Sequence, residues 1–265
     1  MSEGATRLRE TFANADRPLF IPYVMGGYPD VATSLAYAKA IAPHADILEI
    51  GIPFSDPLAD GPTIQAAGQR ALEAGTRPED ILEIAEELRG GPPIVLMTYV
   101  NLLIHSGARG FLERAARAGV AGVIIPDLPI DEGEEIRLAA ERAGVAIVPL
   151  CAPTTSDARL AAIGRVADGF VYCVSVAGVT GGELEVGAAL RAFIARAREQ
   201  ISAPLAVGFG IRGPAQAAEI GSFTDGVVIA SQLIRMIEDT KDPATVAGEL
   251  ADFSAGVRAA LSGTS

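Results

Sequence analysis

Eight short apolar runs, each separated from the next by a longer stretch, limit the folds open to this chain of 265 residues. The runs are continuously apolar rather than alternating, as expected for strands that are covered on both faces. Most of the segments between them are rich in Ala, Leu, Glu and Arg at helical spacing, and several end in glycine, a common helix stop. The runs occupy residues 19–25, 46–52, 93–99, 121–127, 145–151, 169–175, 204–210 and 225–231.

Strand and helix in eightfold alternation predict an α/β fold, a (β/α)8 TIM barrel that occupies residues 1–265 as a single domain. A doubly wound open sheet is the alternative. It normally has fewer strands and a glycine-rich dinucleotide turn after the first, whereas the first run here ends in "MGGYPD". Leu8 and Phe12 stand four positions apart ahead of that run, which predicts an extra N-terminal helix over the bottom of the barrel.

The composition excludes several classes of partner and cofactor. A formal net charge of -12, without a cluster of Lys and Arg, argues against nucleic acid and acidic membrane surfaces. Cys151 and Cys173 stand in apolar runs and are predicted to be core residues, and the cysteines and histidines show no spacing that suits a metal. The N-terminal segment has no apolar signal core, and no apolar run could span a bilayer, so we expect a cytoplasmic protein.

Glu49 is an acidic residue inside the second apolar run, "DILEIGI". Side chains alternate along a strand, so Glu49 shares a face with Ile47 and Gly51, while the opposite face is wholly apolar and suits the layer under the helices. Glu49 is therefore expected to point into the barrel near the carboxyl end of its strand, where active sites of this fold lie. Burial there should raise its pKa and suit it to proton transfer, although a structural hydrogen-bond network is the alternative explanation.

The loop "PFSDPLADGP" that follows is stiffened by proline and carries Asp56 and Asp60. Ordinary turn chemistry would explain both aspartates, yet a loop carboxylate near a buried one can divide acid and base roles with it. Glycine-bearing turns also follow later strands, at residues 177–182, 208–211 and 230–234. Glycines at strand ends serve tight turns, but turns in these places also form phosphate sites from backbone N–H groups, without lysine.

The stretch "LEIGIPFSDPLADGPTIQ" resembles the signature of the tryptophan synthase α subunit family. The similarity continues through "IPYVMGGYP", "MTYVNLL", "IIPDLP", "YCVSVAGVTG" and "VGFGI", in the expected order over nearly the whole chain. The resemblance implies a (β/α)8 barrel that cleaves indole-3-glycerol phosphate to indole and D-glyceraldehyde 3-phosphate. It also implies a chain without a cofactor of its own, paired in an α2β2 heterotetramer with a pyridoxal-phosphate-dependent β subunit that turns the indole into tryptophan.

Residue roles follow from the same resemblance. It implies that Glu49 acts as acid and base at indole C3 and the side-chain hydroxyl, that Asp60 pairs with the indole N–H, and that Asp56 takes part in communication with the β subunit. The implied substrate-binding set comprises Tyr23, Tyr172, Thr180, Gly181, Gly208, Phe209, Gly210, Ala230 and Ser231. Thr180 belongs to the loop after the sixth strand, which closes over substrate in the family.

Several positions depart from the family pattern. Ala230 stands where glycine is expected beside Ser231. The loop around Thr180 reads "SVAGVTGGELEVG", and its "SVA" segment, ahead of "GVTG", lacks the polar or basic residue expected there. These changes bear on phosphate affinity and loop closure. Three alternatives remain: a sugar-phosphate isomerase barrel, a non-catalytic relative that only activates a β subunit, and a relative that releases free indole alone. An isomerase of that kind would carry an acid at the end of the first strand, which "IPYVMGGYP" lacks.

Overall fold

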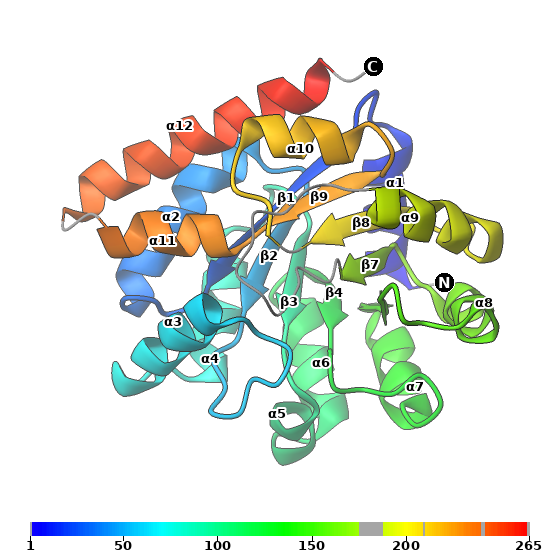
Figure 1. The fold of residues 1–265 in the computed structure, drawn as a ribbon. Coiled ribbons are helices and arrows are strands. Elements are labelled where there is room, and N and C mark those ends of the chain that lie inside the picture. The colour runs from blue at the N-terminus through cyan, green and yellow to red at the C-terminus, as the bar shows by residue number, and fades with distance from the viewer. Residues whose placement is uncertain (1, 175–187, 209, 240–241, 264–265) are drawn as a thin grey trace.

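A ring of parallel strands surrounded by helices forms the body of the protein (Figure 1). The computed structural model describes residues 2–174, 188–208, 210–239 and 242–263. Its strands run in the order β5-β4-β3-β2-β1-β9-β8-β7-β6 and every pair is parallel. The predicted (β/α)8 barrel is confirmed.

The nine described strand segments occupy eight positions in the barrel, because β5 and β6 are two halves of the fifth strand on either side of Pro149. The first half pairs with β4 and the second with β7. Proline has no N–H to give to a ladder, so a strand is readily interrupted there. The segments are β1 (Leu19–Met25), β2 (Leu48–Gly51), β3 (Ile94–Met97), β4 (Val120–Ile124), β5 (Ala146–Val148), β6 (Leu150–Cys151), β7 (Val171–Val174), β8 (Leu205–Gly208) and β9 (Gly226–Ile229).

Helices cover the outside of this ring, and the long C-terminal helix α12 packs along α10 and α2 (Figure 1). Several end in glycine as predicted; Gly144, for example, takes a left-handed conformation with φ of 81° after α7. The described helices are α1 (Glu3–Ala13), α2 (Val31–Ile41), the short 3-10 helix η1 (Ala42–His44), α3 (Pro62–Glu73), α4 (Pro78–Glu87), α5 (Val100–His105), α6 (Ala108–Arg117), α7 (Glu134–Ala143), α8 (Asp157–Val166), α9 (Ala188–Gln200), α10 (Pro214–Gly221), α11 (Ser231–Asp239) and α12 (Pro243–Ser262).

The N-terminal helix α1 closes the bottom of the barrel, as the sequence predicts. Leu8 is fully buried in the cluster of side chains that fills the barrel interior. Phe12 packs against the same cluster, and its ring lies 5.5 Å from that of Phe170, measured between centroids. Because α1 seals one end, a ligand cavity inside the barrel must open at the other, where the strands have their carboxyl ends.

The two faces of β2 have the environments that the alternation predicts. Ile47, just before the strand, belongs to the interior cluster, whereas Leu48 and Ile50 pack with the helices outside. Glu49 therefore lies on the interior face, with 2% of its surface exposed.

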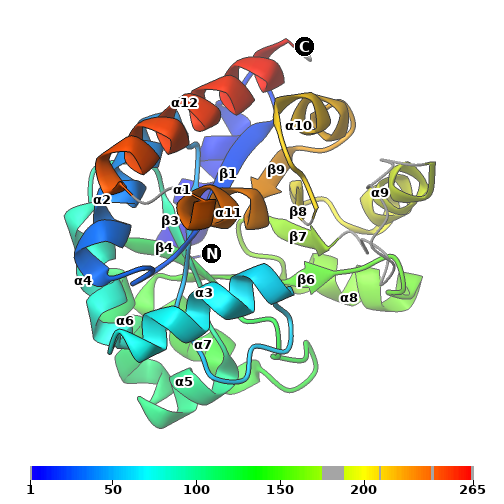
Figure 2. The same cartoon turned by 60° about the vertical axis from the view of Figure 1, so that its left-hand side comes forward.

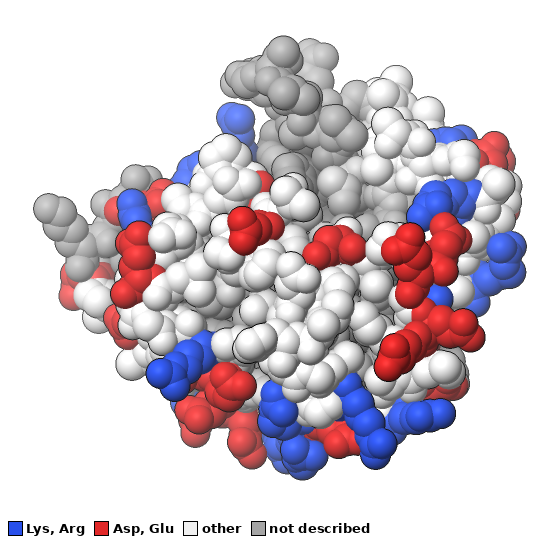
Figure 3. All heavy atoms as spheres, turned by 90° about the horizontal axis from the view of Figure 1, so that it is seen from below, with Lys and Arg blue, Asp and Glu red and all other residues white. Residues whose placement is uncertain are grey.

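Other sequence-based expectations also meet the structure here. Cys151 and Cys173 are buried free thiols on β6 and β7, with their Sγ atoms 3.5 Å apart, so their placement in the core is confirmed. No described helix is long and apolar enough to cross a membrane. Within the described ranges, no cluster of three or more His, Cys, Asp or Glu side chains is arranged to hold a metal ion. On the face seen in Figure 3, basic side chains lie among acidic ones, with uncharged residues between the groups.

Candidate active site

A cavity of about 230 Å³ lies at the carboxyl ends of the strands and reaches into the barrel. Its walls are mainly apolar, and its polar groups are two carboxyl groups, two phenols and one hydroxyl. The lining residues are Tyr23, Glu49, Ala59, Asp60, Gly61, Ile64, Met97, Ile124, Leu150, Tyr172, Val174, Gly210, Ile211, Ala230 and Ser231. The structure therefore brings Glu49 and Asp60 together with five of the predicted substrate-binding residues.

Glu49 is held in this cavity by the strand ladder. It pairs with Tyr23 of β1 on one side and Val95 of β3 on the other. Its Oε2 atom is buried without a hydrogen-bond partner among the described residues. Burial, reinforced by the nearby negative charge of Asp60, raises the pKa of Glu49 to about 8. At neutral pH the carboxyl group is therefore mostly protonated and able to donate a proton.

Asp60 reaches the cavity from the loop after β2, which is folded as a turn. Its backbone N–H donates to the carbonyl of Pro57, and its own carbonyl accepts a hydrogen bond of 2.9 Å from the side chain of Gln65 on α3. Partial burial raises the pKa of Asp60 to about 6, although a hydrogen bond from Tyr99 opposes the rise. Asp60 therefore remains mainly ionised at pH 7, while Glu49 is mainly neutral.

Tyr99 lies beside the candidate site, although the sequence reasoning did not single it out. It follows β3 at the same rim, its ring stacks on Phe54 at 5.0 Å between centroids, and its hydroxyl accepts a 3.3 Å hydrogen bond from the N–H of Ala59. The same hydroxyl acts on the Asp60 carboxylate and lowers its pKa. The local pattern did not mark Tyr99, because it simply ends the apolar run at residues 93–99. Tyr99 fixes the loop beside Asp60.

Two tyrosines shape the cavity because each faces a glycine on the next strand. A Cβ atom on Gly51 would lie 1.9 Å from the hydroxyl oxygen of Tyr23, and one on Gly208 would lie 2.0 Å from that of Tyr172. Either side chain would have to leave its place if the glycine became any other residue. Gly208 thus seats Tyr172, and it is not itself among the residues that line the cavity. Desolvation holds the pKa of both phenols well above its usual range.

The opposite wall combines a glycine turn with a helix start. Gly210 has a positive φ of 76°, which favours glycine, and Ala230 precedes Ser231, the first residue of α11. Figure 2 shows α11 beside α3, the helix that follows Asp60, and an ion pair of 3.4 Å between Arg70 and Glu238 joins them. A helix N-terminus attracts anions, so this wall suits the acidic end of a substrate.

The remaining predicted residues are not part of the cavity that the structure describes. Asp56 is exposed on the loop, where its carboxylate accepts a 2.5 Å hydrogen bond from Ser55. Thr180, Gly181 and Phe209 lie outside the described residues, as does the altered loop around Thr180. The apolar walls formed by Ile64, Met97, Ile124, Leu150, Val174 and Ile211 were not predicted either, because their strand and helix positions resemble ordinary core positions.

The geometry favours proton transfer to and from a flat apolar substrate that carries an anionic group. A neutral carboxylic acid and an ionised carboxylate face one cavity, and their environments separate their pKa values, which is the usual basis of divided acid and base roles. The walls around the carboxyl groups are mainly apolar, and the start of α11 lines the same cavity.

Known proteins share both the sequence and the fold of this chain. The sequence model of the family described as tryptophan synthase alpha chain matches residues 10–261. A tryptophan synthase alpha chain from Carboxydothermus hydrogenoformans is 45% identical over 240 residues, covering 88% of this chain and 90% of that protein. The Deinococcus radiodurans chain of the same name is 42% identical over 258 residues, 94% of this chain and 95% of the relative.

Solved structures agree with these sequence matches. A chain of Mycobacterium tuberculosis tryptophan synthase superposes with a TM-score of 0.88 at 34% identity, covering 96% of this chain and 98% of the other. The tryptophan synthase subunit alpha of Legionella pneumophila superposes with a TM-score of 0.87 at 33% identity, over 99% of both chains. The likeness therefore extends over nearly the full length of the chain.

Proposed function

The chain belongs to the tryptophan synthase alpha chain family, and we propose that it cleaves indole-3-glycerol phosphate to indole and D-glyceraldehyde 3-phosphate through the carboxyl groups of Glu49 and Asp60. The observation that carries the residue roles is the pairing of a mostly neutral buried acid with a mostly ionised carboxylate in one apolar cavity. The overall reaction is that of a carbon–carbon lyase.

The two carboxyl groups divide the chemistry. Protonated Glu49 donates its proton to C3 of the indole, and the ring nitrogen takes up the positive charge that results. Ionised Asp60 stabilises that charge through the ring N–H. The bond between C3 and the glycerol carbon then breaks, its electron pair returns to the ring, and the carboxylate of Glu49 takes the hydroxyl proton as the aldehyde forms. Each general acid or base contributes on the order of 10²- to 10⁴-fold in rate.

Substrate binding is assigned to the remaining predicted residues. Tyr23 and Tyr172 flank the flat ring inside the barrel, and Gly210, Ala230, Ser231 and the start of α11 receive the phosphate. Gly208 acts indirectly by leaving room for Tyr172. Thr180, Gly181 and Phe209 complete the set as proposals that rest on the family pattern alone.

The partner is a tryptophan synthase β subunit, which holds the pyridoxal phosphate of the pathway, while this chain needs no cofactor for its own reaction. We assign the loop after β2 to that interface. Asp56 is exposed there, and the large apolar side chain of Leu58 is 88% exposed, as expected for a surface that a partner covers. The assembly would be an α2β2 heterotetramer in the cytoplasm, with residues 1–265 of this chain folded as one domain.

An assay of indole release tests these assignments. Glu49→Gln and Asp60→Asn should each remove most of the cleavage activity at pH 7, both in the isolated chain and with a β subunit added. The control is Glu83→Gln, an exposed residue on α4, which should keep full activity. Retained activity in Glu49→Gln would refute the catalytic assignment. Loss of far-UV dichroism or of a cooperative melt in either variant would indicate a structural role.

The β subunit itself should accelerate cleavage by the wild-type chain. Sedimentation of the mixture checks the partner assignment: a single larger species is expected, and two separate species would contradict it. Wild-type activity that stays the same when β is added, together with separate sedimentation, would instead favour a relative that releases free indole alone.

A further inference from the structure

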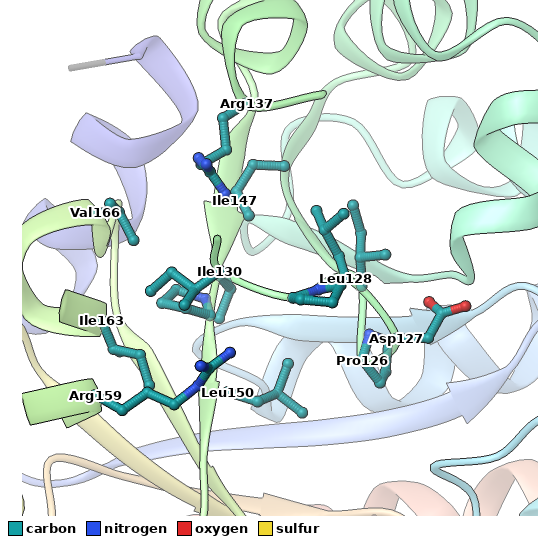
Figure 4. A pocket seen from close by; sticks show the side chains of 14 residues that line it. Pro126, Asp127, Leu128, Ile130, Arg137, Ile147, Leu150, Arg159, Ile163 and Val166 are labelled. Carbon is teal, nitrogen blue, oxygen red and sulfur yellow. The ribbon is translucent and has the colours of Figure 1, made fainter. Parts of the chain in front are cut away.

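A second cavity, of about 340 Å³, lies outside the barrel between α7 and α8. We call it the α7–α8 groove. Figure 4 shows its walls, with Ile147 of β5 and Ile130 in the middle and with Ile163 and Val166 of α8 on one side. These walls are apolar, and 37% of the surface of Val166 remains exposed in the groove. Its volume is within the range of small-molecule sites.

The groove lies over the place where the barrel ladder is interrupted. The fifth strand breaks at Pro149, so β5 pairs only with β4 and β6 only with β7 among the described strands. Pro149 and both of its neighbours line the groove. The position of the groove follows from the order of the elements. Helix α7 comes directly before β5, and α8 comes directly after β6, so the two helices flank the break.

Two arginines supply the charge of the groove. Arg137 of α7 is half-buried, and no hydrogen bond or ion pair joins its guanidinium to any residue that the structure describes. Arg159 of α8 pairs with Asp131 at 2.9 Å, but the two side chains are 48% and 68% exposed, so the pair is weak and easily exchanged. In Figure 4 the two guanidinium groups lie on opposite sides of the apolar middle of the groove.

The acidic residue that lines the groove does not pair with Arg137. Asp127 also lines the groove, but its carboxylate accepts a 2.9 Å hydrogen bond from the N–H of Val100 and lies at the end away from Arg137 (Figure 4). The guanidinium of Arg137 is partly exposed to solvent and has no hydrogen-bond or ion-pair partner among the described residues, so it is open to an anionic ligand. Its planar fork matches a carboxylate.

We propose that the α7–α8 groove binds a small amphipathic carboxylate, with the carboxylate on Arg137 and the apolar body on Ile130, Ile147, Ile163 and Val166. The site is separate from the indole cavity, and only Leu150 lines both. Binding there does not depend on the catalytic assignments, so each can fail without the other.

Methyl NMR on the full chain, titrated with hexanoate, tests the proposal. Ile163 lines only the α7–α8 groove and Ile64 only the indole cavity, so their methyl signals report the two sites separately. We expect a saturable shift of the Ile163 and Val166 signals and no shift of Ile64. Hexanamide, which has the same body without the charge, should bind at least about tenfold more weakly. A shift of Ile64 alone, or no saturable shift, would overturn the proposal.

Variants then assign the contacts. Arg137→Gln should weaken hexanoate binding by about tenfold or more, whereas Arg159→Gln, across the apolar middle and paired with Asp131, should change it little. The matched control is Arg142→Gln, an exposed arginine on the same helix that does not line the groove. An unchanged affinity in folded Arg137→Gln would refute the site, as would an equal loss in the control.

Discussion

At the scale of the residue, the burial of Glu49 determines both its chemistry and its effect on stability. The pKa of Glu49 is about 8 in the folded chain, against about 4.5 for the ordinary carboxyl group. Between these two values the folded state binds more protons than the unfolded state. Stability therefore falls as the pH rises through this window. An active-site acid that is protonated at pH 7 is thus also a source of instability above pH 8.

Glu49→Gln should accordingly stabilise the chain at high pH. The neutral amide removes the free energy that ionising Glu49 costs in the folded state, on the order of 4 kcal/mol above pH 8. Urea unfolding of the variant and the wild type at pH 4.5 and pH 8.5 measures this difference in the free energy of unfolding. The variant should gain stability over the wild type at pH 8.5 and little at pH 4.5. An equal difference at both values would contradict a raised pKa for Glu49.

Tyr99→Phe should shift the acidic side of the activity profile to higher pH. The Tyr99 hydroxyl stabilises ionised Asp60, so its removal raises the pKa of Asp60 further above its value of about 6. A shift of about one pKa unit would reduce kcat/KM at pH 6 by about fivefold and leave it much less changed at pH 8. The pH profile of kcat/KM for indole release checks this. A loss that is the same at every pH would show that Tyr99 serves only packing.

The sequence was sufficient to place Glu49 and insufficient to find Tyr99, for a physical reason. A carboxyl group in an apolar strand conflicts with its local pattern, and the strand's alternation then determines which face it occupies. A tyrosine at the end of an apolar run, by contrast, fits the local pattern and does not stand out. Its role depends on the fold of a loop forty residues earlier in the chain, which local pattern does not encode.

At the scale of the element, the barrel strands depend on close approach between tyrosines and glycines. Gly51→Ala should displace Tyr23, because the added Cβ would lie 1.9 Å from the hydroxyl oxygen. We expect a loss of about 1–3 kcal/mol in stability. Thermal melts measure it against Gly248→Ala, where the added methyl group meets nothing within 4 Å on an exposed face of α12. Equal stability of Gly51→Ala and wild type would contradict the packing described for Tyr23.

Helix α1 should contribute substantially to stability as the bottom layer of the barrel. Leu8→Ala would leave a cavity among fully buried side chains, and such changes cost about 2–5 kcal/mol. Chemical denaturation of the full chain measures it. The control is Leu138→Ala on α7, where the side chain is 44% exposed and the expected loss is much smaller. Similar losses in the two variants would contradict a sealing role for α1.

The fifth strand shows where the apolar pattern stops being informative. The run at residues 145–151 predicts one strand, and the structure instead divides it at Pro149. Hydrophobicity reports burial, and both halves are indeed packed in the barrel, whereas the ladder depends on N–H groups that proline lacks. The proline was visible in the sequence, but the divergence of α7 and α8 above it was not.

At the scale of the whole molecule, the eightfold repeat of strand and helix made the fold predictable, because each repeat adds one strand to the inner ring and one helix to the outer ring of a closed barrel. The active end followed from the same repeat, since Glu49 lies within the second strand and the acidic loop and the glycine turns follow strands. The α7–α8 groove did not follow, because it depends on how far two helices stand apart rather than on any local pattern. Ile147 on β5 and Ile163 on α8 line the groove, but their places in the sequence pattern are those of ordinary core residues.

The pH dependence of kcat/KM for indole release by the wild-type chain tests the central claim most directly. Activity requires Asp60 ionised and Glu49 protonated, and their pKa values are about 6 and about 8. We therefore predict a bell-shaped profile with its maximum near pH 7, falling below about pH 6 and above about pH 8. A rate that continued to rise through pH 9 would show that Glu49 does not act as the acid, and would contradict the account.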